Sequence, residues 1–139
     1  MRRSSQADVA VMRLVAPFET LHPAYVLGAM QHEGSLEFLE GNPAHDEFRR
    51  ISAVVPTIVT VYLDRPAILT PLKGHARAIL ANFGISDDAL LDVLAGRARP
   101  EGKLPFDLPA SKGAIGTQLS DVAHDIVGPL YLFGFGRRY

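Results

Sequence analysis

The chain has 139 residues, 47 % of them hydrophobic and 21 % charged, which are the proportions of one ordinary globular domain. It contains no cysteine, and this excludes disulfides, thiolate metal sites and cysteine nucleophiles. Its formal net charge is −1, its arginines are scattered, and no apolar run reaches the roughly 18 residues of a membrane span, so we expect no nucleic-acid partner and no membrane contact.

The first part of the chain contains one strand and one long connection. Residues 1–6 have a basic start, but no apolar segment of a secretion signal follows, so we expect a cytoplasmic protein. Residues 9–16 are apolar except for Arg13 and predict a strand that Pro17 ends. Residues 17–42 have no clear periodicity. Connections of this length are uncommon unless they are functional or disordered, and the aromatic residues here argue against disorder.

A helix is expected to begin at Asn42 and Pro43. Asparagine is a favoured N-cap, proline is a favoured first helical residue, and two acidic residues follow in the first turn. Phe48, Ile51 and Val55 give this helix an apolar stripe that can pack against a sheet.

Residues 57–63 are the expected centre of the core. Nearly all are β-branched, aromatic or aliphatic and they do not alternate with polar residues, which predicts a strand covered on both faces. Asp64, Arg65 and Pro66 end this strand. Ligands of open α/β sheets bind beyond the carboxyl ends of the strands, so these residues point toward the functional end of the domain. Asp64 and Arg65 could bind a hydroxyl-rich ligand, but a structural ion pair is the commoner role of such neighbours.

Strand and helix continue to alternate after this point. Residues 66–72 predict a short helical turn, and residues 78–83 predict a third parallel strand. The clearest helix covers residues 87–95, where Ser86 is the cap, Gly96 ends the helix, and the inward-facing residues are expected to be Leu90, Leu91 and Leu94. This alternation predicts an α/β fold with right-handed crossovers.

Prolines and glycines interrupt the last third of the chain. Residues 104–109 carry prolines near both ends, so they cannot form a central strand but can form an edge strand or a strap. Residues 110–128 are expected to be irregular, and residues 129–139 are too aromatic for a solvated tail.

Three motifs carry a resemblance to a known family. Residues 96–109 read Gly-Arg-Ala-Arg-Pro-Glu-Gly-Lys-Leu-Pro-Phe-Asp-Leu-Pro, which is similar to the Gly-x-x-x-Pro-x-Gly-Arg-Leu-Pro-x-x-x-Pro signature of glycoside hydrolase family 3. Residues 129–136 resemble that family's Pro-Leu-Tyr-Pro-Phe-Gly-x-Gly ending, and Arg65-Pro66 resembles its Gly-Arg-Pro corner. Each motif is weak alone, but three in the right order make the resemblance specific. The family contains β-glucosidases, β-xylosidases and N-acetylglucosaminidases.

The resemblance implies part of a retaining, β-glucosidase-like glycosidase with two domains. A (β/α)8 barrel supplies the aspartate nucleophile, and an α/β sandwich closes over the sugar and often supplies the acid/base glutamate. A barrel alone needs roughly 250 residues, so residues 1–139 are expected to be a single, truncated C-terminal domain, a three-layer sandwich with a mostly parallel sheet and helices on both faces. The implied partners are a β-linked glycoside or oligosaccharide and a barrel on another chain. The alternative is a noncatalytic module that binds carbohydrate or a partner chain.

The resemblance implies Glu33 as the catalytic acid/base. Family members often carry Ser-Gly-Glu-Gly-x-Asp-Arg on a loop after a sandwich strand, and Glu33-Gly34 matches its Glu-Gly pair. Leu36-Glu37 stands where that motif has Asp-Arg, which is a departure from it. The other interpretation is an exposed loop carboxylate, and Glu37 and Glu19 are weaker candidates for the acid.

No metal and no cofactor are expected. The five histidines lack a spacing such as His-Glu-x-x-His, and the chain has neither a Gly-x-Ser-x-Gly elbow nor a phosphate-binding glycine loop.

The predicted sheet would lack the neighbours that precede its first strand in the family. We therefore expect an uncovered apolar face or edge that makes the chain dimerise, aggregate or recruit a partner. Arg13 is expected to face that missing surface and to find its counter-charge there. Alternatively, residues 17–42 fold back and cover the gap.

Overall fold

The structure is a computed structural model that describes residues 7–138. Residues 1–6, with their basic start, and Tyr139 lie outside the described residues. No helix within residues 7–138 has the length and apolarity needed to cross a membrane. In chain order the elements are β1 (Ala10–Val15), the 3-10 helix η2 (Gly28–Met30), α1 (Pro43–Ser52), β2 (Thr57–Tyr62), α2 (Thr70–Lys73), β3 (Ala78–Asn82), α3 (Asp87–Leu94) and α4 (Lys112–Gly116).

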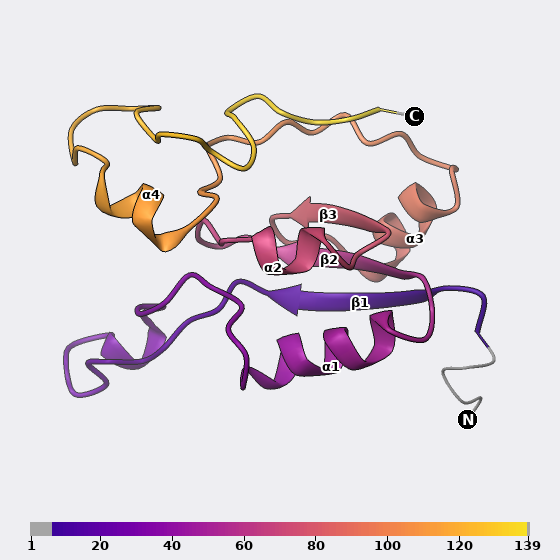
Figure 1. The fold of residues 1–139 in the computed structure, drawn as a ribbon, viewed down its shortest axis with the longest axis horizontal. Helices are drawn as coiled ribbons and strands as arrows, with labels where there is room; N and C mark the ends of the chain where they lie inside the picture. The colour runs from indigo at the N-terminus through magenta and orange to yellow at the C-terminus, as the bar shows by residue number, and fades with distance from the viewer. Residues whose placement is uncertain (1–6, 139) are drawn as a thin grey trace.

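The three predicted strands form one parallel sheet in the order β1-β2-β3. Ala10 lies opposite Thr57 across the first pair of strands, and Ile58 lies opposite Ala78 across the second. Figure 1 shows the three arrows pointing the same way, with helices connecting them. The α/β class is confirmed. Crossover helices are required because parallel neighbours cannot be joined by a tight turn.

Helices lie on both faces of the sheet, as predicted. On one face Phe48 of α1 is fully buried in a cluster with Leu14, Val59 and Val61. Successive strand residues point to opposite faces, so Arg13, which precedes Leu14, lies on the other face, where it contacts the start of α3. The three layers are therefore α1, the sheet and α3.

The helix boundaries follow their local signals with some differences. The Asn42 side chain accepts bonds from two backbone N–H groups in the first turn of α1, as expected of an N-cap. Leu90 of α3 is buried, but the prediction that Leu91 faces inward is wrong, because this residue is 50 % exposed. The short helix expected at residues 66–72 is α2, which begins only at Thr70.

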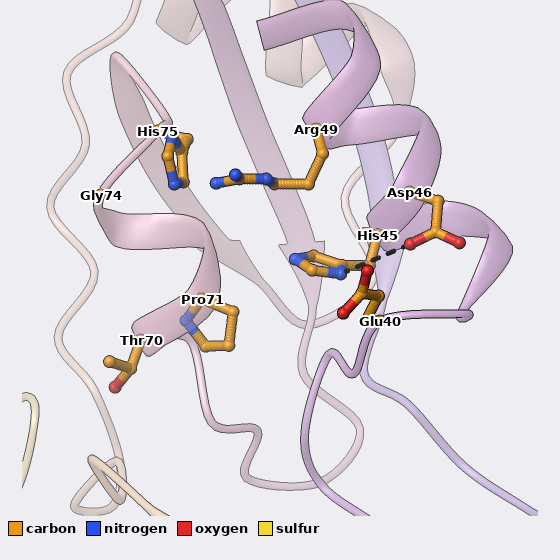
Figure 2. A pocket seen from close by; sticks show the side chains of 8 residues that line it. All are labelled: Glu40, His45, Asp46, Arg49, Thr70, Pro71, Gly74 and His75. Atoms are coloured by element: carbon orange, nitrogen blue, oxygen red, sulfur yellow. Dashed lines mark ion pairs between the residues drawn. The ribbon is translucent and has the colours of Figure 1, made fainter. Parts of the chain in front are cut away.

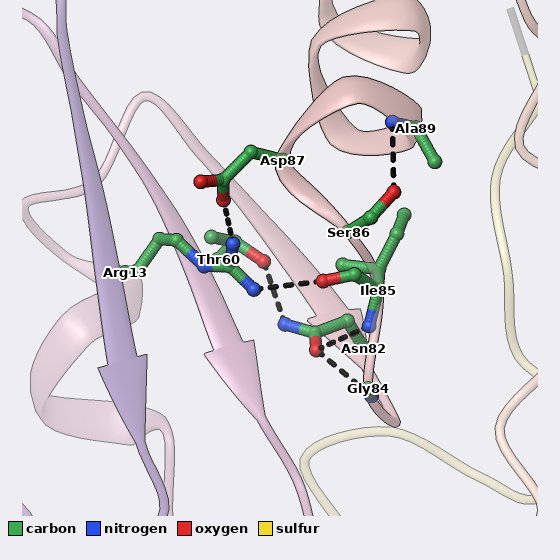
Figure 3. A network of polar contacts seen from close by, with 8 residues as sticks. All are labelled: Arg13, Thr60, Asn82, Gly84, Ile85, Ser86, Asp87 and Ala89. Carbon is green, nitrogen blue, oxygen red and sulfur yellow. Dashed lines mark hydrogen bonds and ion pairs between the residues drawn. The ribbon is translucent and has the colours of Figure 1, made fainter.

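A polar network joins α3 to the sheet (Figure 3). The Asn82 amide donates to the Thr60 hydroxyl at 2.8 Å and accepts from the Gly84 N–H at 3.2 Å. Arg13 reaches from β1 past Thr60, donates to the Ile85 carbonyl at 2.9 Å and pairs with the Asp87 carboxylate. The expectation that Arg13 finds its counter-charge on a missing neighbour is therefore wrong: the counter-charge lies within the chain.

We expect Asn82→Ala to lower the free energy of unfolding by about 1–3 kcal/mol, because it leaves the buried Thr60 hydroxyl and the backbone N–H of the β3–α3 turn without their partner. Urea unfolding followed by circular dichroism measures this change. The control is Gln31→Ala on an exposed residue, and an equal effect of the two substitutions would contradict the role of the network.

The last third of the chain forms a strap over the core. Leu104 and Leu108 exchange backbone hydrogen bonds of 2.8–2.9 Å with residues 130–135, in an antiparallel arrangement. The strap interpretation is therefore confirmed, although Phe133 remains 57 % exposed. The prediction that residues 110–128 are irregular is wrong for α4, which Ser111 caps. A five-residue helix is too short to show a helical period.

One sheet face is only partly covered. Three valines on the same face as Arg13 are 44–48 % exposed, namely Val9, Val11 and Val15. Tyr62 lies opposite Val15 on the neighbouring strand and is 37 % exposed. The prediction that β2 is covered on both faces is therefore wrong at Tyr62. Within the described part of the chain, α3 leaves this corner of the sheet open to solvent.

Candidate functional site

The long connection 17–42 and the α4 segment both lie at the carboxyl end of the parallel sheet (Figure 1). Backbone bonds of 2.9–3.0 Å pair Glu19 with Glu33 in both directions, and Ile68 donates to the Leu36 carbonyl at 2.9 Å. These bonds give the connection a defined shape although it has little regular structure. Glu33 is thereby positioned at the end of the sheet where ligands of α/β folds bind.

The Glu33 carboxylate accepts hydrogen bonds from three donors. One oxygen accepts from the backbone N–H groups of Leu21 and His22 at 3.0 and 3.1 Å, and the other lies 2.8 Å from Nδ1 of His22. The side chain is 25 % exposed. The His22 hydrogen bond and then the backbone donors lower the pKa of Glu33 below its ordinary value, although partial burial opposes them.

Two glycines permit the chain path around Glu33. Gly34 has φ +70°, and a Cβ at this position would collide with the Glu19 side chain. A Cβ at Gly28 would collide with the carbonyl of His22, whose N–H and ring contact Glu33. Glycine is therefore favoured at both positions, and the glycine of the Glu-Gly pair is explained by its positive φ and by the nearby Glu19 side chain.

The end of β2 holds the same loop from the other side. The Arg65 guanidinium donates to the carbonyl of Glu33 and, at 3.2 Å, to that of Gly34. Asp64 contacts Nδ1 of His32, whose ring stacks on Phe18 with centroids 3.7 Å apart. The expected ion pair between Asp64 and Arg65 is therefore wrong. Both residues lie in the bend that follows β2, and each contacts a different part of the loop.

The arrangement suits hydroxyl recognition better than proton donation. An ionised carboxylate accepts hydrogen bonds from sugar hydroxyls, whereas a general acid needs a raised pKa. Of the weaker candidates, Glu19 lies opposite Glu33, while the Glu37 N–H bonds to the hydroxyl of Ser35. No group of three histidines and carboxylates within residues 7–138 is placed to hold a metal. Sequence reasoning missed His22, whose role depends on the folded loop.

A hollow lies away from Glu33, between α1 and α2 (Figure 2). It has a volume of about 490 Å3, and the Arg49 side chain extends across it toward His75. The His45 ring also points into it; its Nδ1 is buried without a hydrogen-bond partner and lies 3.9 Å from the Asp46 carboxylate. None of the residues predicted for the site lines this hollow.

The ionised state of Glu33 should make the stability of the 17–42 loop pH-dependent. Its lowered folded pKa means that its contribution is fully present above the ordinary pKa near 4.5 and is lost as the pH falls through the folded pKa. We expect the melting temperature of Glu33→Gln to fall less than that of the unsubstituted chain between pH 7 and pH 3. Thermal melts across this range measure the difference. Glu101→Gln, on an exposed residue, is the control, and parallel curves for all three proteins would contradict the expectation.

Comparison with known proteins identifies the relatives of this chain. The family model described as "Glycosyl hydrolase family 3 C-terminal domain" matches residues 2–139. The chain is 47 % identical over 131 residues to a periplasmic beta-glucosidase/beta-xylosidase of Dickeya chrysanthemi, covering 94 % of this chain and 20 % of that protein. It is 39 % identical over 136 residues to beta-glucosidase C of Emericella nidulans. That match covers 98 % of this chain and 21 % of that protein.

Solved structures agree in fold. A beta-glucosidase from Listeria innocua, in complex with isofagomine, is similar with a TM-score of 0.65 and 19 % identity, over 96 % of this chain and 21 % of that one. The chain spans about a fifth of the length of the curated relatives that it matches.

Proposed function

Because this chain belongs to the glycosyl hydrolase family 3 C-terminal domain family, we propose that it supplies the α/β-sandwich portion of a retaining, β-glucosidase-like enzyme. The substrates of the complete enzyme would be β-linked glycosides or oligosaccharides. The observation that carries this proposal is the coverage: nearly the whole chain aligns with beta-glucosidases, but with only 20–21 % of their length. The nucleophile then belongs to a portion that residues 1–139 do not contain.

The loop that holds Glu33 carries a surface suited to a protein partner. Val26, Leu27 and Met30 lie on this loop and are 90, 68 and 76 % exposed. Leu27 also has φ +61°, a left-handed conformation that is uncommon for leucine. Exposed apolar side chains next to a candidate site support contact with a second domain, which here would be the barrel.

The proposal is tested by complementation. The chain is mixed with the portion of the Dickeya chrysanthemi relative that it does not cover, and aryl β-glucoside hydrolysis is measured. Activity that appears only in the mixture supports the proposal. A mixture that binds, shown by comigration in gel filtration, but does not hydrolyse any β-glycoside would contradict it.

In such a complex we propose Glu33 as the acid/base. Covering the loop with a partner desolvates the carboxyl group and raises its pKa, as a proton donor requires. Glu33→Gln should then reduce hydrolysis of alkyl β-glucosides by about 10²–10⁴-fold, and of dinitrophenyl β-glucosides by much less, because good leaving groups need little protonation. An equal and small loss on both substrates, matching that of Glu101→Gln, would show that Glu33 has no role in proton transfer.

One observation favours the alternative of a noncatalytic carbohydrate-binding module. The hydrogen bonds from His22 and the backbone lower the pKa of Glu33 in the chain alone, which suits an acceptor of sugar hydroxyls. Saturable binding of cellobiose to the isolated chain that Glu33→Gln abolishes, together with failed complementation, would favour this function.

A further inference from the structure

A second hollow lies at the carboxyl end of the sheet, between the strap and the α4 segment. Its volume is about 320 Å3, and its walls are mainly apolar, formed among others by Leu36, Pro66, Phe106, Ile115, Val122 and Ile126. An apolar cavity of only about 150 Å3 accommodates benzene, so this hollow is large enough for one aromatic ring.

An oriented histidine lines this apolar hollow. The carboxylate of Asp107, whose side chain is only 4 % exposed, lies 3.2 Å from Nδ1 of His124 and accepts the N–H of Phe133 at 2.5 Å. A carboxylate can only accept, so the proton of neutral His124 lies on Nδ1, and Nε2 presents a lone pair. The ring is 51 % exposed, which leaves Nε2 available to a hydrogen-bond donor.

The backbone conformation of His124 also indicates that its surroundings hold this residue in place. Its φ is +60°, in the left-handed region that glycine adopts most readily. A residue other than glycine keeps this conformation only where the surrounding structure holds it in place. Here the holding contacts are the Asp107 hydrogen bond and the Phe133 ring, whose centroid lies 4.8 Å from that of His124.

We propose that this hollow binds a small aromatic ring that carries a hydroxyl group, a phenol. The ring occupies the apolar walls, and the hydroxyl donates its hydrogen to Nε2 of His124. An apolar body with one hydrogen-bonding group matches the general composition of small-molecule sites, in which a few polar groups fix the orientation. The site lies within this chain and needs no second domain, so it is independent of the proposed glycosidase function.

The test is a titration of the full chain with p-cresol and with toluene, followed by amide shifts in NMR spectra. The two probes have similar apolar bodies and differ in the hydroxyl group. We expect saturable shifts around Phe106 and Val122 with both, and roughly three- to tenfold tighter binding of p-cresol, the factor for one hydrogen bond. No saturable binding, equal affinities for the two probes, or shifts confined to other parts of the chain would overturn the proposal.

Three variants separate the apolar walls from the histidine. Val122→Trp fills the hollow and should weaken the binding of both probes at least tenfold. Leu119 is an exposed residue of the same segment that does not line the hollow, so Leu119→Trp should leave both affinities unchanged. His124→Asn keeps a residue type that tolerates positive φ and removes Nε2, so it should abolish the preference for p-cresol. Unchanged affinities in Val122→Trp, or a retained preference in His124→Asn, would overturn the proposal. Circular dichroism checks that each variant is folded. If a variant is not folded, the amide shifts of the unsubstituted chain with the two probes decide the proposal.

Discussion

The purified chain should hydrolyse 4-nitrophenyl β-glucoside no faster than buffer. A retaining glycosidase needs two carboxyl groups about 5–5.5 Å apart, one as nucleophile and one as proton donor. In the described structure the Glu33 carboxylate is bonded to His22 and to two backbone N–H groups, and its pKa is lowered, so it is poorly suited to donate a proton. Enzymes accelerate such reactions by at least about 10⁶-fold, so a working site would give turnover far above the buffer rate.

The experiment compares the chain with a Glu33→Gln variant and with buffer, using enough protein to detect a thousandth of a typical turnover. Clear turnover that Glu33→Gln abolishes would contradict the expectation and indicate a self-contained site. Glu19 lies opposite Glu33, so Glu19→Gln would then identify whether it is the second carboxylate. Turnover that survives both substitutions would indicate a contaminating glycosidase. The Glu101→Gln chain, purified in the same way, is the control for contamination.

The second large effect concerns association. We expect the mass of the chain in solution to exceed the 15.1 kDa of one copy and to rise with concentration. Val11 and Val15 leave an apolar patch exposed beside β1, which is an edge strand of the sheet formed by residues 7–138. The outer backbone groups of an edge strand can pair with another strand. Residues 17–42 lie at the carboxyl end of the sheet (Figure 1) and leave these two valines exposed.

Light scattering across a concentration series measures this association. The variant Val11→Lys/Val15→Lys places charges on the uncovered face and should shift the mass toward 15.1 kDa. Val127→Lys is the matched control, because Val127 is 75 % exposed but lies outside the sheet. A constant mass near that of one copy for the unsubstituted chain, with cooperative unfolding, would contradict the prediction. Association that the paired lysines leave unchanged would place the contact elsewhere.

Local patterns in the sequence were sufficient for the elements and the family. The apolar runs predicted β1, β2 and β3, and the capping residues Asn42 and Ser86 located the starts of α1 and α3. These signals work because caps and strand patterns depend on residues that are close together in the chain. The three motifs predicted the family for the same reason, since each is a short run of neighbouring residues, and the match over residues 2–139 confirms it.

Only the tertiary structure decided which side chains meet. Arg13 pairs with Asp87 across 74 positions of sequence, Asp64 and Arg65 contact the 17–42 loop rather than each other, and Asp107 orients His124. The lowered pKa of Glu33 likewise depends on His22, which reaches it only after the loop has folded. Periodicity reports which face of an element a residue occupies, but hydrogen bonds and pKa values depend on distances between atoms of residues far apart in the chain, and only the packed fold determines those distances.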